Sequence, residues 1–164
     1  QAKRVALRLK DEKIDYIYSS DLARAADTAK EIAKFHKNIP IKFVQELRER
    51  NLGEFQGKTK KELGMAENTF VATFLQPKYG ETKEALCKRA DSFLHKILRH
   101  HNKDTVLFVG HNGINKAIIC SITKRKHEDL KDIENMKNTS ICIFDIDEEK
   151  NHKIHVFNCI KHLD

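Results

Sequence analysis

Short apolar segments and amphipathic helical patterns alternate along this chain of 164 residues, and that alternation constrains the fold more than any other feature. Apolar runs predict strands at 15–19, 41–44, 105–109, 141–146 and 154–160. Helical periodicity predicts helices at 1–12, 21–33, 81–101 and about 114–123, with a shorter helix after Thr59. Helices between consecutive strands are typical of an α/β fold, so we predict a three-layer αβα sandwich with a mostly parallel central sheet. The length suits a single domain covering residues 1–164.

The composition narrows the classes of partner and cofactor. A formal net charge of +7 suits anionic partners, either phosphorylated metabolites or nucleic acid. The sequence has no RNP-like aromatic motif and no zinc-finger spacing, which disfavours nucleic acid. Its histidines show no HExxH or other metal-ligand spacing, so no metal site is predicted. No pattern in the sequence bears on the oligomeric state.

The cysteines and the hydropathy pattern bear on the compartment. The four cysteines form no CxxC pair and lie mostly in apolar surroundings, as in AIICSI and SICIF. We therefore predict reduced, buried thiols in a cytoplasmic protein. No apolar run approaches the roughly 20 residues that a membrane span requires, so no membrane partner is expected.

Polar side chains follow three of the predicted strands, at the edge where parallel α/β sheets bind their ligands. Ser20 follows the first strand, and Arg24 lies one turn into the next helix. Glu49 follows the second strand, within LRERNLGEFQG. His111 follows the third, between two glycines in VLFVGHNG. The strand ends thus offer an arginine, a carboxylate and a histidine to one edge of the sheet.

Each of these residues has a functional and a purely structural interpretation. The glycines beside His111 permit positive φ and a close backbone approach, and the following helix start favours an anion that an imidazole could contact. A histidine that only bonds within its turn is the alternative. Arg24 suits bidentate phosphate contact, but it could equally be a solvated helix arginine. Glu49 could act as a general acid, or it could pair at the surface with Arg48 or Arg50.

Four segments together resemble the histidine phosphatase superfamily, which has the phosphoglycerate mutase-like fold. They are YSSDLARAADTAKEIA, LRERNLGEFQG, YGETKEALCKRADSFL with its later arginine Arg89, and VLFVGHNGINKAII. Each is similar to a short motif of the family, and they occur in the family's order over residues 1 to about 145. Four ordered motifs are more specific than any one of them.

The resemblance implies roles for individual residues. Arg24 matches the family's second phosphate-clamping arginine, Glu49 the general acid, and His111 the second histidine, which stabilises the transferring phosphoryl group. The backbone N–H of Asn112 is expected to add to the anion site, and Ser20 is a further candidate for substrate binding. The family uses two arginines and two histidines where other enzymes use Mg²⁺, so neither a metal nor another cofactor is expected.

One departure from the family pattern concerns the nucleophile. The family opens with a strand that ends in Arg-His-Gly, whose histidine becomes phosphorylated, and no Arg-His-Gly occurs in this sequence. Gln1-Ala2 is similar to a pair that lies within the family's first helix. We therefore expect an N-terminally truncated domain whose first strand and nucleophile lie upstream of residue 1. Such a fragment alone is expected to be inactive.

The segment from Glu49 to Gly80 bears on the reaction type. It is short, whereas mutases of this family tend to carry a longer insertion there. We therefore predict a metal-independent phosphatase that hydrolyses a small phosphorylated metabolite through a phosphohistidine intermediate. The alternatives are phosphoglycerate mutase-type phosphoryl transfer, a non-catalytic phosphate-binding domain and a basic nucleic-acid-binding module.

Overall fold

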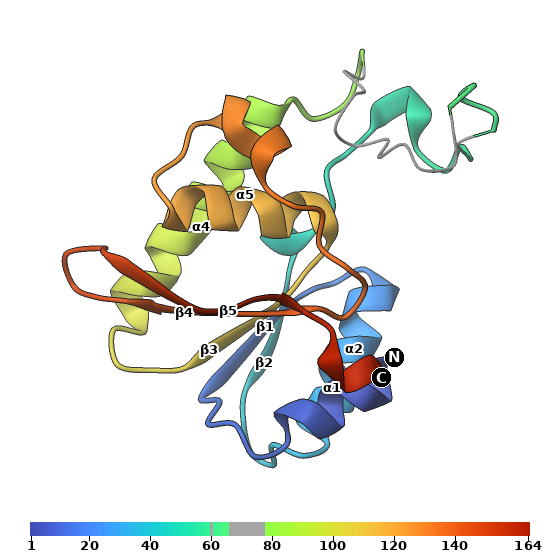
Figure 1. Ribbon diagram of the computed structural model, residues 1–164. Coiled ribbons are helices and arrows are strands. Elements are labelled where there is room, and N and C mark those ends of the chain that lie inside the picture. The colour runs from blue at the N-terminus through green and yellow to red at the C-terminus, as the bar shows by residue number, and fades with distance from the viewer. Residues whose placement is uncertain (60, 66–77) are drawn as a thin grey trace.

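The computed structural model describes residues 1–59, 61–65 and 78–164, and its elements follow the predicted alternation (Figure 1). The α-helices are α1 (Ala2–Leu9), α2 (Ala23–Ala33), α4 (Lys83–His100) and α5 (Asn112–Ile122). The strands are β1 (Tyr16–Ser20), β2 (Ile41–Val44), β3 (Val106–Val109), β4 (Ile141–Ile146) and β5 (His152–Cys159). Short 3-10 helices occupy η1 (Gln45–Leu47), η2 (Gly53–Phe55), η3 (His127–Asp132) and η4 (Lys161–Leu163). The helix predicted after Thr59 is not seen at 61–64, which form turns, and its remainder lies outside the described residues.

The structure confirms the predicted α/β class and its three layers. Strands β2, β1 and β3 form a parallel sheet in that order, and β4 pairs antiparallel with β5. Helices α1 and α2 pack together on one side of these strands, and α4 and α5 pack together on the other (Figure 1). Ser19 lies beside Phe43 on one side and beside Val109 on the other, so the carboxyl ends of the three parallel strands meet at one edge.

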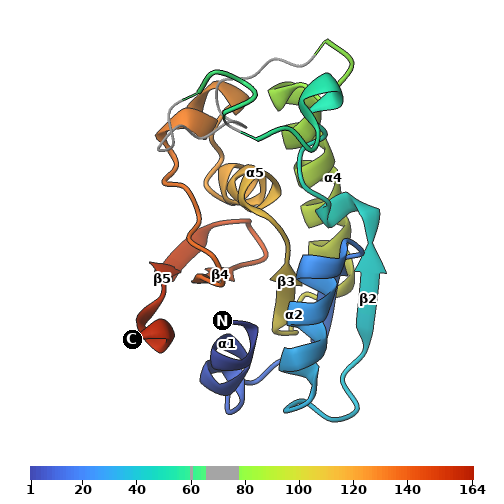
Figure 2. The same cartoon turned by 90° about the vertical axis from the view of Figure 1, so that its right-hand side faces the viewer.

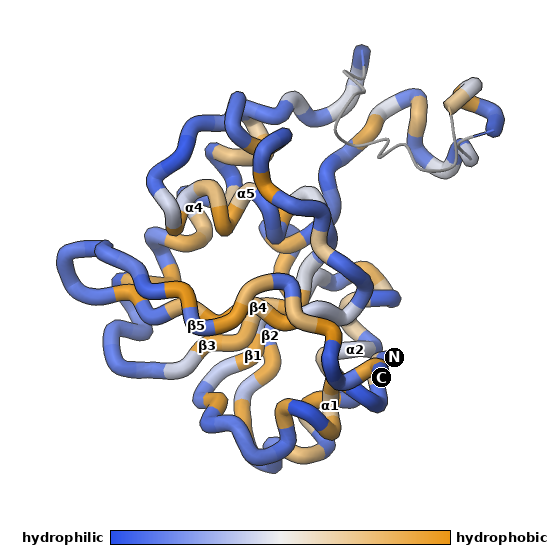
Figure 3. Tube along the Cα trace, in the orientation of Figure 1, coloured by the Kyte–Doolittle hydropathy of each residue, from blue (hydrophilic) through white to orange (hydrophobic). Residues whose placement is uncertain are grey.

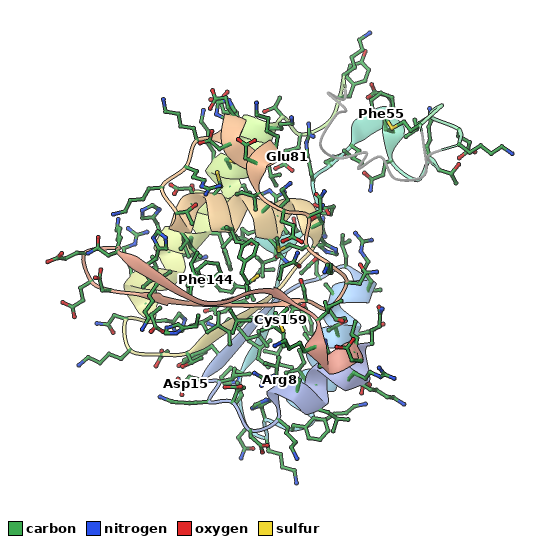
Figure 4. The ribbon with its side chains drawn as sticks, viewed as in Figure 1. Arg8, Asp15, Phe55, Glu81, Phe144 and Cys159 are labelled. Carbon is green, nitrogen blue, oxygen red and sulfur yellow. The ribbon has the colours of Figure 1, made fainter. Side chains whose placement is uncertain are left out.

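The two sheets belong to the same middle layer. Strand β3 alternates, with Val106 and Phe108 packed against the core of α4 and α5, and Leu107 and Val109 against the core of α1 and α2. Strand β4 alternates in the same way, and Phe144 lies on the side of β4 that faces α5 (Figure 4). β4 lies between β5 and β3 (Figure 2), yet within the described residues β3 pairs only with β1, and β4 only with β5.

The hydropathy colouring shows that apolar residues are frequent along the strands and recur along the helices that flank them (Figure 3). On one side the core is built from aliphatic residues of α1 and α2 with Ile17 of β1. On the other side Phe93 of α4 and Ile114 of α5 lie in a larger core. Among the described residues, no helix is both long enough and apolar enough to cross a membrane.

Candidate active site

His111 lies at the point where β3 gives way to α5. Helix α5 begins at Asn112, earlier than predicted, so His111 is its N-cap residue and has extended backbone geometry. The side chain is buried, with the residue 7% exposed. Arg24 Nε donates to Nδ1 of the imidazole at 3.0 Å, and Nε2 lies 2.9 Å from Ser20 Oγ. Because a guanidinium nitrogen can only donate, Nδ1 accepts, and the remaining ring proton therefore sits on Nε2 and is donated to Ser20.

The surroundings of His111 favour its neutral form. Burial, and after it the positive charge of Arg24, lower the pKa of His111 to about 4. Both effects disfavour the imidazolium, because a buried cation loses hydration and a neighbouring cation repels it. A negatively charged group next to Arg24 would oppose both effects. The imidazole is thus set to gain a proton when an anion arrives.

Ser20 orients the imidazole from the end of β1. Its side chain is fully buried, and its Oγ also accepts a hydrogen bond from the backbone N–H of Leu22 at 3.2 Å. The hydroxyl group therefore contacts His111 and the start of α2 within the protein. Direct contact of Ser20 with a substrate stays a prediction.

Glu49 reaches the same helix start from the segment after β2. Its Oε2 accepts from the backbone N–H of Gly113 at 3.1 Å, and its Oε1 accepts from the backbone N–H of Arg50 at 2.8 Å. The carboxylate is half-buried, and its hydrogen-bond partner Gly113 lies two residues after His111 in the sequence. The structure thus brings Arg24, Glu49 and His111 together, as the strand-end argument predicts.

The glycines of VLFVGHNG allow the expected close approach without the positive φ that glycine also permits. The positive-φ glycines among the described residues do not include Gly110 or Gly113. A Cβ at Gly113 would collide with the Glu49 carboxylate, and one at Gly110 would meet the side chains of Asn115 and Ile114. The glycines are needed for space, because the carboxylate approaches the helix start directly at Gly113.

Asn112 holds a neighbouring loop with its side chain. Its Oδ1 accepts from the backbone N–H of Met136 at 2.8 Å, and its Nδ2 donates to Asn135 Oδ1 at 3.3 Å. The side chain is therefore engaged with residues 135–136. The predicted contribution of the Asn112 backbone N–H to an anion site is independent of these bonds and stays a prediction.

Two ion pairs that the sequence analysis missed brace the segment carrying Glu49. Arg48 donates through Nε and Nη2 to Asp21, at 2.7 and 2.5 Å, so Asp21 pairs across the site instead of bonding to the start of α2. Arg89 of α4 donates from Nε and Nη2 to Glu81, at 2.8 and 2.7 Å, and from Nη1 to the Arg48 carbonyl. Glu81 is marked in Figure 4, near the start of α4. Sequence spacing gives no signal for these pairs, since Asp21 and Arg48 lie 27 residues apart and Glu81 precedes α4 by two residues, eight before Arg89.

An arginine, a buried histidine and a carboxylate thus gather at the carboxyl ends of parallel strands, the edge where α/β sheets bind ligands. The chain belongs to the histidine phosphatase superfamily, because the family model described as histidine phosphatase superfamily (branch 1) matches residues 1–159.

Individual relatives agree with that membership. The chain is 31% identical over 172 residues to phosphoglycerate mutase-like protein 4 of Arabidopsis thaliana, an alignment that covers 100% of this chain and 73% of that protein. It is 36% identical over 132 residues to the metal-independent phosphoserine phosphatase of Arabidopsis thaliana, covering 76% of this chain and 56% of that protein. Among solved structures, Bacillus stearothermophilus YhfR is similar with a TM-score of 0.85 and 27% identity, covering 99% of this chain and 83% of that one.

Proposed function

We propose that this protein is a phosphatase that hydrolyses a small phosphorylated metabolite through a phosphohistidine intermediate. The observation that carries the proposal is the direct contact of Arg24 Nε with His111 Nδ1, with the Glu49 carboxylate held on the backbone N–H of Gly113 at the same helix start. Family membership and the similarity to a relative named as a metal-independent phosphoserine phosphatase support it.

The proposed reaction uses the three side chains in turn. The phosphoryl group binds beside Arg24 and His111, and its charge raises the proton affinity of the imidazole, which then donates to a phosphoryl oxygen in place of its contact with Arg24. A nucleophilic histidine attacks phosphorus, and the P–O bond to the leaving alcohol breaks as protonated Glu49 gives its proton to that oxygen. The Glu49 carboxylate then takes a proton from the water that attacks the phosphohistidine, which restores both groups.

We propose that the nucleophile lies on a strand outside residues 1–164. Strands β3 and β4 pack against the same two cores, as neighbouring strands of one sheet do, but among the described residues they share no hydrogen-bonded ladder. A strand that pairs with both would deliver a residue to the carboxyl end of β3, beside His111. A polypeptide extended upstream should therefore be active, and residues 1–164 alone should release no phosphate; equal rates would refute this assignment.

The reaction type is tested with the extended polypeptide in the presence of a metal chelator. We expect release of inorganic phosphate from p-nitrophenyl phosphate at an unchanged rate after chelation. Interconversion of phosphoglycerates without phosphate release would instead indicate mutase-type transfer. The similarity to a phosphoglycerate mutase-like protein is the reason for testing this alternative.

A non-catalytic phosphate-binding domain is the second candidate, because the 164 residues contain no Arg-His-Gly. Such a protein would bind phosphate at Arg24 and His111 without turnover. Acid-labile labelling of the extended polypeptide by a ³²P-phosphomonoester separates the two, because only a phosphohistidine intermediate retains the label. An unlabelled protein that still binds phosphate would favour the second candidate.

A further inference from the structure

A groove lies between α4, the end of α5 and the turn that joins β4 to β5, three parts that lie on the same side of the molecule (Figure 1). Its volume is about 260 Å³. His111 caps the start of α5 and the groove adjoins its end, so the 11 residues of this helix, a length of about 16 Å, lie between them. The groove is therefore separate from the proposed phosphoryl site.

Apolar side chains form part of the groove lining. They are Leu94 and Leu98 of α4, Ile122 at the end of α5 and Ile146 at the end of β4. All four belong to the larger core or pack against it, so they are held in place. An apolar cavity of about 150 Å³ holds a benzene molecule, so the groove suits an apolar body of about ten non-hydrogen atoms.

Among the described residues, three cations line the groove, and they come from two different segments. Lys124 and Arg125 directly follow α5, and Lys150 lies in the turn between β4 and β5. The partial negative charge at the end of a helix favours cations there, which accounts for the first two but not for Lys150. Hydrogen bonds from Asn151, and to a smaller extent the charge of Lys124, lower the pKa of Asp147, so Lys124 has a carboxylate nearby. Within the described part of the chain, neither Arg125 nor Lys150 has a carboxylate at ion-pair distance.

The anionic group of the groove already has its partners. Among the described residues of the lining, only Asp91 bears a carboxylate. Ser121 Oγ donates to its Oδ1 at 2.6 Å, and Nδ1 of His95 lies 3.2 Å from its Oδ2. The charge that the groove leaves without a partner is therefore positive, on Arg125 and Lys150.

The backbone does not explain the two lysines of the groove. φ is +55° at Lys124 and +60° at Lys150, in the left-handed region where glycine is the most favourable residue. The turns alone would therefore favour glycine at both positions, and each lysine adds a long cationic side chain to the groove instead.

We infer that this groove is a binding site for a small organic anion, which combines an apolar body of about ten non-hydrogen atoms with one anionic group. The apolar body would pack on Ile122 and Ile146, and the anionic group would accept hydrogen bonds from Arg125 and Lys150. The inference is independent of the proposed function, since no residue of the groove takes part in the proposed reaction.

The test compares two probes of the same shape and different charge. 3-Phenylpropionate carries a carboxylate where 3-phenylpropionamide carries a neutral amide. Binding to the extended polypeptide is followed by the methyl resonances of Ile122 and Ile146, which line the groove. We expect 3-phenylpropionate to bind with a dissociation constant of about 1 mM, about 5-fold more tightly than the amide or better, as exposed ion pairs allow. The resonances of the His111 imidazole should not move.

The cations are tested one at a time and together. Lys150→Met and Arg125→Met should each reduce the preference for the acid by about half, and the double variant should bring the two dissociation constants within about 1.5-fold of each other. Both positions are exposed, so these variants should keep the fold. Lys96→Met, at an exposed position of α4 outside the groove, removes the same charge and should leave the preference intact.

Three results would overturn the inference. The first is equal binding of the acid and the amide, and the second is a preference that survives in the double variant. The third is 3-phenylpropionate at about 10 mM that shifts neither Ile122 nor Ile146, or that shifts His111 instead. These results would leave the phosphatase proposal standing, because that proposal depends on residues at the other end of α5.

Discussion

Two buried imidazoles, one at each end of the parallel sheet, have nearly the same contacts with opposite electrostatics. Nε2 of His111 lies 2.9 Å from the Ser20 hydroxyl, and Nε2 of His101 lies 2.9 Å from the hydroxyl of Tyr18. At Nδ1, however, His111 meets the guanidinium of Arg24 at 3.0 Å, whereas His101 meets the carboxylate of Asp104 at 2.9 Å.

The difference shows which of the two histidines has a negatively charged partner within the protein. A carboxylate beside His101 balances any positive charge that the ring acquires, and the ring also packs against Tyr16 at 4.3 Å between centroids. This end of the sheet ties the last turn of α4 to β1. At His111 a cation faces the imidazole, so the positive field there is balanced only when an anion binds. We therefore interpret His101 as a structural residue and propose the chemical role for His111.

Removing each imidazole is the most severe test of that assignment. In the catalytically complete polypeptide, His111→Ala should lower kcat/KM by about 10³-fold, because a group that stabilises the transferring phosphoryl oxygen is lost. His101→Ala should leave kcat/KM nearly unchanged but lower the melting temperature by several degrees, since buried hydrogen bonds worth about 1–3 kcal/mol are broken. Steady-state kinetics and thermal unfolding of both variants check this. Equal kinetic losses would break the distinction.

The cation beside His111 gives the next largest effect. Arg24→Met should weaken inorganic phosphate binding by about 10- to 100-fold, because a charge-assisted contact is lost. It should also raise the pKa of His111 from about 4, though not to its ordinary value, since burial is the larger cause and remains. Phosphate titrations and NMR titration of the imidazole measure the two effects. Arg99→Met, at an exposed position of α4, is the charge-matched control and should change neither.

The site residues could be predicted from sequence because their positions follow from topology. Once 15–19, 41–44 and 105–109 are strands of a parallel sheet, the residues after them must meet at one edge, which brings Arg24, Glu49 and His111 together. The strand bounds 41–44 and 141–146 coincide with those of β2 and β4. The start of α5 was placed too late, because the polar stretch at its beginning carries no apolar period.

Contacts that depend on how loops fold back could not be predicted. Lys116 has the sequence context of an ordinary helix lysine, yet it is buried and donates to Asn135, which lies on a loop after η3. The position of Asp21 before a helix predicts a cap residue, but its carboxylate accepts two hydrogen bonds from Arg48 instead. No local sequence pattern indicates this pair. A close approach at Gly113 is expected from the sequence, but the approaching group, the Glu49 carboxylate, is visible only in the structure.

The carboxylates of Glu49, near His111, and Asp104, beside His101, allow a further comparison of the two ends of the sheet. Glu49→Gln should lower turnover of alkyl phosphates by about 10- to 100-fold and affect p-nitrophenyl phosphate much less, because only a poor leaving group needs a proton in the transition state. Asp104→Asn should show no dependence on the leaving group. Rates for a series of phosphomonoesters of graded leaving-group pKa provide the measurement. An equal loss on alkyl and aryl esters would contradict the acid role of Glu49.

The smallest expected effect is on the pH dependence of stability. The pKa of His111 is lowered to about 4 in the folded protein, so below the ordinary value of 6.5 the unfolded chain binds more protons there than the native state does. Stability attributable to this group is therefore full above pH 6.5 and is lost as the pH falls from 6.5 toward 4. Between pH 7 and 5.5 the loss should be about 1 kcal/mol.

Urea unfolding should show this slope in the wild type and in His101→Gln but not in His111→Gln. Saturating phosphate should reduce it, because a bound anion raises the pKa of His111 toward its unfolded value. A slope that follows His101 instead would reverse the roles assigned to the two imidazoles.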